Sequence, residues 1–261
     1  MKKTLLITGL FISLFSFGED FKPETEKDYL YRIEKVDISD LWTLTEFKES
    51  EEDTLIIYRQ EPLGFIGDNY QRFQIHFISV MPNLENKLEY YVYGKTKVKG
   101  NVCDFQGTIR INEAKTYIGE EIPDITQGSI SGNYEFFESP KQNGAGIVKG
   151  IFHSDFYLDK GNHIKYNALW IVADGYCNNQ FEGTWASYKT GETKKCNWGD
   201  YRIPECEWQN GCDIGAAYFS INPRYRQNGW ENYYRANDSD DNNPEVLKAR
   251  KIEAEKWWIE K

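Results

Sequence analysis

Between residues 54 and 188 the chain repeats one short pattern, in which a glycine stands between two apolar residues at spacings of two. The copies are Phe105-x-Gly107-x-Ile109, Ile130-x-Gly132-x-Tyr134, Val148-x-Gly150-x-Phe152 and Phe181-x-Gly183-x-Trp185. Residues two apart lie on the same face of a strand, so each glycine belongs to the apolar face. Glycine weakens the interior of a strand and is typical of places where a sheet bends. The pattern therefore predicts a strongly curved sheet.

The segments around these glycines alternate between apolar and polar residues, as half-buried strands do. The predicted strands cover residues 54–59, 72–80, 88–98, 103–111, 129–137, 146–158, 163–172 and 180–188. Turn sequences at 142–144 and 159–162 favour hairpins, which join antiparallel neighbours. No helical period lies between the strands, which disfavours an α/β fold. We predict an all-β fold whose antiparallel sheet is closed or partly closed into a barrel, with a β-sandwich as the alternative.

The first 18 residues have the order of a secretory signal peptide, in which a basic end precedes an apolar stretch and small residues. The apolar stretch is shorter than the roughly 20 residues that span a bilayer. We therefore expect an extracytoplasmic protein, periplasmic or secreted, with no stable membrane insertion after the signal is cleaved.

The rest of the chain is predicted to form one β-barrel-like domain over residues 19–243, with cysteine-bearing loops at 189–215. Residues 39–53 fit a short helix or a strand equally well. Asn243, Pro244 and Glu245 form a helix start, with an N-cap, a proline at the first helical position and an acid in the first turn. We predict a C-terminal helix within residues 244–261 that docks on the same domain.

The chain holds five cysteines, an odd number, so at least one cannot pair within the chain. Export favours disulfides over zinc for the cysteines of the C-terminal half. The disulfide candidates are Cys177, Cys196, Cys206 and Cys212. We expect one bridge among the last three, with Cys177 as a further candidate. Cys103 shares a strand face with apolar residues and is predicted to be a buried free thiol.

The charge and the motifs narrow the function classes. The net charge is −10, and about −12 without Lys2 and Lys3, so the chain repels phosphate backbones and no nucleic-acid partner is expected. The chain contains no nucleophile elbow, phosphate-cradling glycine loop or His-Glu-x-x-His motif. His153 and Asp155 share a strand face, but an outward polar face explains them better than a metal site does. We predict no catalytic residues, metal or cofactor.

Aromatic residues gather in the C-terminal third of the chain, several of them in the predicted cysteine-bearing loops. The candidate ligand-binding residues are Trp198, Tyr201, Trp208 and Trp230. Aromatic rings on rigid loops bind sugars or partner surfaces, whereas buried ones would fill a junction between sheet, loops and helix.

Three functions remain compatible with the sequence. The first is an exported, non-catalytic binding protein for a small apolar ligand, a glycan or a protein partner. The second is a carbohydrate-active hydrolase that uses a carboxylate pair from the predicted strands. The candidates for such a pair are Glu89, Glu135, Asp155 and Glu182. The third is a structural, envelope-associated protein.

Overall fold

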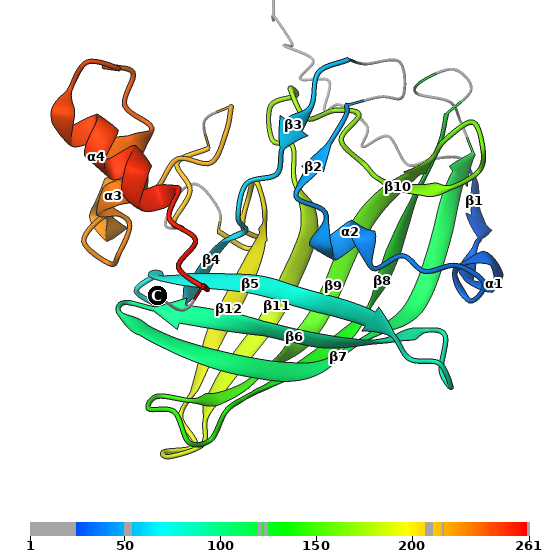
Figure 1. The fold of residues 1–261 in the computed structure, drawn as a ribbon, viewed down its shortest axis with the longest axis horizontal. Coiled ribbons are helices and arrows are strands. Elements are labelled where there is room, and N and C mark those ends of the chain that lie inside the picture. Colours follow the sequence, from blue (N-terminus) through cyan, green and yellow to red (C-terminus); the bar gives the residue numbers. More distant parts are fainter. Residues whose placement is uncertain are drawn as a thin grey trace, which may run out of the picture.

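The computed structural model describes residues 25–49, 54–118, 122, 125–206, 211–215 and 217–259. The predicted signal peptide, residues 1–18, lies outside this part of the chain. Among the described residues, eight strands of a ten-stranded sheet close into a ring (Figure 1). They are β4 (Leu63–Ile66), β5 (Gln71–Pro82), β6 (Glu89–Val98), β7 (Asn101–Ile118), β8 (Thr126–Glu138), β9 (Gly146–Leu158), β11 (Asn178–Ser187) and β12 (Thr193–Asp200).

Every pairing in the ring is antiparallel, and β12 pairs back onto β4 to close it. Two short strands extend the sheet: β1 (Thr25–Asp28) lies beside β7, and β10 (Ile164–Tyr166) lies beside β9. The ring is uneven, because β4 has 4 residues and β7 has 18. The predicted antiparallel, strongly curved and closed sheet is confirmed.

The mid-strand glycines lie where the backbone of an adjacent strand leaves no room for a side chain. A Cβ atom added to Gly107, Gly132, Gly150 or Gly183 would lie 1.9–2.2 Å from a carbonyl oxygen of the adjacent strand. No real Cβ atom tolerates such a contact, so a larger residue would push the two strands apart. These glycines therefore allow the sheet to curl tightly enough to close.

Aromatic side chains fill the middle of the ring. The rings of Phe181 and Trp198 stack at 5.0 Å between centroids, and those of Phe105 and Phe136 stack at 4.8 Å. The large aromatic side chains of this core that lie fully inside are Phe73, Tyr90, Phe105, Phe136, Phe156, Phe181 and Trp198. Because the core is packed, the ring is not an open channel.

The N-terminal segment covers one end of the ring, which we call the closed end. It carries α1 (Leu30–Ile33), α2 (Asp40–Thr43), and the two-stranded sheet of β2 (Glu46–Phe47) and β3 (Ile57–Tyr58). Residues 39–49 thus contain both a helical turn and a strand, whereas residues 50–53 lie outside the described part. Trp42 inserts between Tyr90 and Phe152, at centroid distances of 5.3 and 5.8 Å.

A buried charge pair ties this segment to the ring. Arg59, which precedes β4, lies 2.9 Å from Asp200 at the end of β12. Arg59 also donates a hydrogen bond of 2.8 Å to the carbonyl of Trp42 in α2. Tyr166 and Asn179 donate to Asp200 as well, at 3.0 and 2.8 Å. The pair therefore links strands of the ring to helix α2, which covers the closed end.

The C-terminal part forms a small helical unit beside β4 and β5 (Figure 1). It contains the 3-10 turn η1 (Pro223–Tyr225), α3 (Glu231–Ala236) and α4 (Pro244–Glu253). A second apolar cluster joins it to the ring, with Trp230 and Phe219 packed against Phe65 and Leu63. No helix of the described residues has the length and apolar character needed to cross a membrane.

Helix α4 begins at the predicted residue, where the side chain of Asn243 accepts a 2.9 Å hydrogen bond from the amide of Glu245. It ends at Glu253 and packs mainly on α3. A bidentate pair between Glu253 and Arg72, at 2.8 and 2.6 Å, fastens it to β5. Beyond the helix the chain turns, and Trp258 stacks on His76 at 3.7 Å.

Candidate functional site

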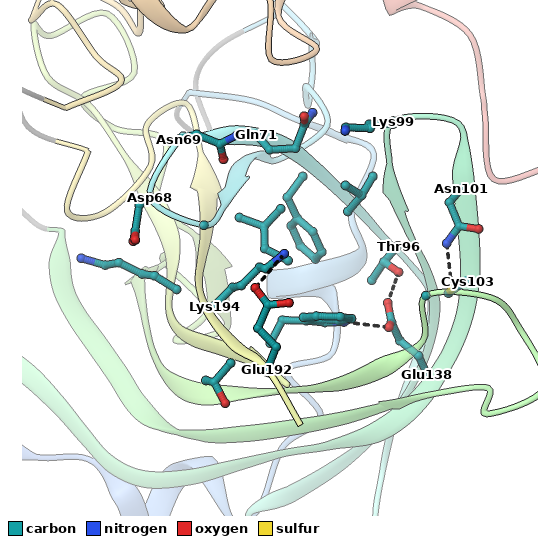
Figure 2. Close-up of a pocket in the computed structure, with 18 of the residues that line it drawn as sticks. Asp68, Asn69, Gln71, Thr96, Lys99, Asn101, Cys103, Glu138, Glu192 and Lys194 are labelled. Carbon is teal, nitrogen blue, oxygen red and sulfur yellow. Dashed lines mark hydrogen bonds and ion pairs between the residues drawn. The ribbon is translucent and has the colours of Figure 1, made fainter. Parts of the chain in front are cut away.

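The ring holds a cavity of about 650 Å³ at the end opposite α1 and α2, which we call the mouth pocket (Figure 2). Its lining comes from seven of the eight ring strands, all except β9, and from the hairpin turns at this end. The apolar part of the lining consists of Ile66, Phe73, Val98 and Trp185. The polar part consists of Asp68, Asn69, Gln71, Thr96, Lys99, Asn101, Cys103, Glu138, Asn143, Glu192, Thr193, Lys194 and Lys195.

The alternation of β8 places a carboxyl group inside this pocket. Gly132, Tyr134, Phe136 and Glu138 follow one another at spacings of two, so all belong to the inward face. Glu138 is the last residue of the strand and is 4% exposed. The strand therefore ends with an acid where the pattern calls for an apolar side chain.

Neutral donors hold the carboxylate of Glu138 (Figure 2). Thr96 on β6 donates its hydroxyl to Oε1. Oε2 accepts from the amide of Gly146 at 2.7 Å and from the indole Nε1 of Trp185 at 2.9 Å. A Cβ atom at Gly146 would lie 2.7 Å from the Trp185 ring, so glycine is needed for this approach. The carboxylate is thus fixed by three strands besides its own.

Burial raises the pKa of Glu138, and its hydrogen bonds offset that rise only in part. No lysine or arginine of the described residues pairs with it. Burial, and next the charge of Glu138, raises the pKa of the nearby Cys103 thiol to about 11. The same two causes raise the pKa of Cys196. Glu138 is therefore a buried acid whose charged form lacks a cation.

The charged residues at the rim of the pocket are largely paired with one another. Lys194 lies 3.4 Å from Glu192, and Lys195 pairs with Glu205. Asp68 and Lys99 form no ion pair among the described residues. Besides the buried Glu138, the pocket thus contains one acid, Asp68, and one base, Lys99, without an ion-pair partner among the described residues.

The predicted aromatic site is not brought together in the structure. Trp198 belongs to β12 and is 1% exposed, so the prediction that it lies in an irregular loop is wrong. Trp230 is fully buried in the second cluster, where its Nε1 donates to the carbonyl of Tyr70 at 2.9 Å. Tyr201 lines a separate hollow of about 330 Å³ together with Tyr176 and other residues. Trp208 lies outside the described residues.

The disulfide prediction is confirmed in its main part, because Cys206 and Cys212 are bonded. Cys177 and Cys196 are free, and Cys196 is buried inside the ring. Cys103 is a buried free thiol, as its strand pattern predicts.

The four carboxylates considered for hydrolysis lie on strand positions that alternate with the inward ones. Glu89 pairs with Arg110 at 2.6 Å, and Asp155 lies 3.0 Å from His153. Glu135 and Glu182 flank inward residues of β8 and β11. None of the four lines the mouth pocket. Within the described residues, no group of three or more His, Cys, Asp or Glu side chains gathers in a way that could hold a metal ion.

Sequence reasoning missed Glu138, although the signal was present. The predicted strand 129–137 stops one residue short of it, and one more step of the same alternation leads to the acid. Its partners Thr96, Gly146 and Trp185 come from three other strands, and no local pattern connects them. The chain matches no protein-family model, and no curated protein and no solved structure is significantly similar to it.

Proposed function

We propose that the protein is an exported, non-catalytic binding protein that holds a small molecule in the mouth pocket. The observation that carries this proposal is a cavity of about 650 Å³ with apolar walls and one buried acid. Small-molecule sites commonly measure roughly 300–1,000 Å³ and combine an apolar lining with a few fixed polar groups. The packed core beneath it stops a ligand from passing further into the ring.

The chemistry of the lining supports binding over catalysis. A glycosidase needs two carboxyl groups that face each other across its substrate. The four strand carboxylates first considered lie outside the pocket, and of the three acids that line it, Glu192 is paired with Lys194. The one thiol of the lining, Cys103, has a pKa raised to about 11 by burial and by Glu138. The lining includes no histidine that could activate it.

Export belongs to the proposal and rests on two observations. The first 18 residues have the order of a signal peptide. The Cys206–Cys212 bond fits an oxidising compartment. Fractionation of the native host, with detection of the chain, tests this part.

The binding proposal can be tested by filling the pocket. Val98 lines it, so Val98→Trp places an indole in the space that a ligand would occupy. The matched control is Ile151→Trp, since Ile151 is exposed on the outer side of β9. The probe is the neutral apolar dye Nile red, measured by fluorescence titration.

We expect wild-type protein and Ile151→Trp to bind the dye equally and Val98→Trp to lose at least about tenfold in affinity, as expected for an occluded site. Circular dichroism checks that both variants are folded. Equal dye binding by a folded Val98→Trp variant and the wild type would overturn the proposal.

A further inference from the structure

The buried acid of the mouth pocket indicates what kind of ligand the pocket takes. Glu138 accepts hydrogen bonds from neutral groups only, and no cation of the described residues pairs with it. Building on the proposed function, we propose that the ligand is a small cationic amine with an apolar body, whose ammonium group binds the carboxylate of Glu138.

The hydrogen-bonding capacity of the carboxylate leaves room for such a group. An ionised carboxylate offers about four acceptor positions. Oε2 accepts two hydrogen bonds, from Gly146 and Trp185, while Oε1 accepts one, from Thr96. One position on Oε1 is therefore left for a donor that comes from the ligand.

Charge favours an ammonium over a neutral hydroxyl at this position. A buried carboxylate without a cation is costly, and a partner of opposite charge offsets much of that cost. The chain supplies such a partner to two other buried acids, since Arg59 lies 2.9 Å from Asp200 and Arg202 pairs with Asp213. At Glu138 a ligand would have to bring the cation.

The rim does not oppose a cationic ligand. The ammonium groups of Lys194 and Lys195 are paired with Glu192 and Glu205. The charges of the pocket that have no ion-pair partner among the described residues are then Asp68 and Glu138 against Lys99. The net charge of −10 on the whole chain also favours the approach of a cation over that of an anion.

The apolar walls determine the rest of the ligand. Phe73, Ile66 and Val98 line the pocket together with the ring of Trp185, which already donates to Glu138. A flat or branched apolar body attached to the amine would pack against these side chains, while its ammonium reaches the acid. Polyamines and free amino acids lack such a body or carry a second charge.

Three probes with the same phenylethyl body and different polar groups separate the contribution of the polar group from that of the apolar body. They are phenethylamine, phenethyl alcohol and phenylpropionate, each titrated into the wild type and into Glu138→Gln by calorimetry. Gln keeps the size of the side chain and removes its charge. Asp68→Asn is the matched control, because it removes a charge at the rim of the same pocket.

We expect the wild type to bind the amine at least about tenfold more tightly than the alcohol, the gain typical of one charge-assisted hydrogen bond, and to bind the acid least. Glu138→Gln should remove the preference for the amine, mainly by weakening amine binding, whereas Asp68→Asn should keep most of the preference. An amine that binds no better than its alcohol, or does not bind, overturns the inference. Nile red binding that Val98→Trp abolishes would still support the pocket itself.

Proton linkage gives a second readout. An ammonium stabilises the ionised form of Glu138, so amine binding in mildly acidic buffer should release protons, which calorimetry in buffers of different ionisation enthalpy detects. The other acids near Glu138 are Cys103, Cys196 and Tyr188, and burial raises the pKa of each. The remaining charged groups of the pocket are Asp68, Glu192, Lys99, Lys194 and Lys195. Proton release that persists in Glu138→Gln would contradict the assignment.

Discussion

The two ends of the ring each bury a carboxyl group, and they treat it differently. Asp200 at the closed end is 1% exposed, and Glu138 in the mouth pocket is 4% exposed. Asp200 accepts hydrogen bonds from Tyr166 and Asn179 and pairs with Arg59. Glu138 has a comparable set of neutral donors and no cation among the described residues.

The difference follows from what each end does. At the closed end the cation is part of the chain, and Arg59 bonds both Asp200 and the carbonyl of Trp42. Burial is the largest single influence and lowers the pKa of Arg59. The charge of Asp200 and its hydrogen bond, together with Tyr166 and Glu61, outweigh burial and raise this pKa overall. At the mouth no arginine or lysine of the described part of the chain pairs with Glu138, and this acid lines a cavity. The closed end thus contains the buried ion pair of Asp200 and Arg59, whereas Glu138 lines the mouth pocket without a cation from the described residues.

The largest effect is expected when the pair at the closed end is broken. Asp200→Ala leaves Arg59 buried without its carboxylate, so the free energy of unfolding should fall by about 3–5 kcal/mol. Urea unfolding followed by fluorescence measures it. The double variant Arg59→Met with Asp200→Leu, which removes both charges, should lose clearly less. A loss below about 1 kcal/mol for Asp200→Ala would remove the contrast between the two ends.

Crowding the mouth pocket should have the next largest effect. Gly146→Ala places a Cβ atom 2.3 Å from the carbonyl oxygen of Ala186 and close to the Trp185 ring. Overpacking of this kind costs about 1–3 kcal/mol, and it should also weaken ligand binding. Gly100→Ala is the control, because nothing lies within 4 Å of its Cβ position. If both variants unfold at the same urea concentration, the close approach at Gly146 is not needed.

The two acids should also differ in pH dependence. Burial raises the folded-state pKa of Glu138 above its ordinary value of 4.5, so its contribution to stability is full below that value. The contribution is lost as the pH rises through the raised pKa, because the folded state then has to hold a buried charge. The difference in unfolding free energy between wild type and Glu138→Gln should therefore fall with rising pH. A difference that rises, or stays flat, contradicts the role given to Glu138.

The smallest effect is expected from the exposed charges at the rim. Lys194 and Glu192 lie 3.4 Å apart with side chains 40% and 60% exposed. Solvent screens such a pair, so Lys194→Ala should change stability by no more than about 0.5 kcal/mol. If Lys194→Ala lowered the free energy of unfolding as much as Asp200→Ala is expected to, the rim charges would stabilise the fold as strongly as the buried pair, which contradicts this prediction. Thermal unfolding at low and high salt measures the change.

Strand alternation and interior glycines were sufficient to predict the curved, closed sheet. Both are local patterns, and the turns at 142–144 and 159–162 set which neighbours pair. Strand β12 was not predicted, because its sequence contains the polar residues Lys194, Lys195 and Asn197 and shows no clear apolar alternation. Its burial depends on partners outside the strand. Asn197 donates its amide to the carbonyl of Pro204 and accepts from the amide of Gly183, and β12 pairs with β4, which lies about 130 positions earlier. No local pattern reports such contacts.

The cysteines show the same limit. A spacing of 6 residues brings Cys206 and Cys212 together, which sequence could suggest. Cys196 was an equally good candidate in sequence, but it points into the ring and is buried there beneath apolar side chains. Its inward orientation follows from the register of β12 against β4, in which Cys196 lies opposite Ile66. That register cannot be read from spacing.

The closure of the ring also has a kinetic consequence. Most pairs in the ring join strands that are neighbours in sequence, but β4 pairs with β12, whose residues stand about 130 positions further along the chain. Bringing such distant segments together carries a loop-closure entropy that the hairpins avoid. We expect the pairing of β4 with β12 to form last during refolding. Until it forms, β4 and β12 present unpaired strand edges, the kind of surface through which nascent chains aggregate.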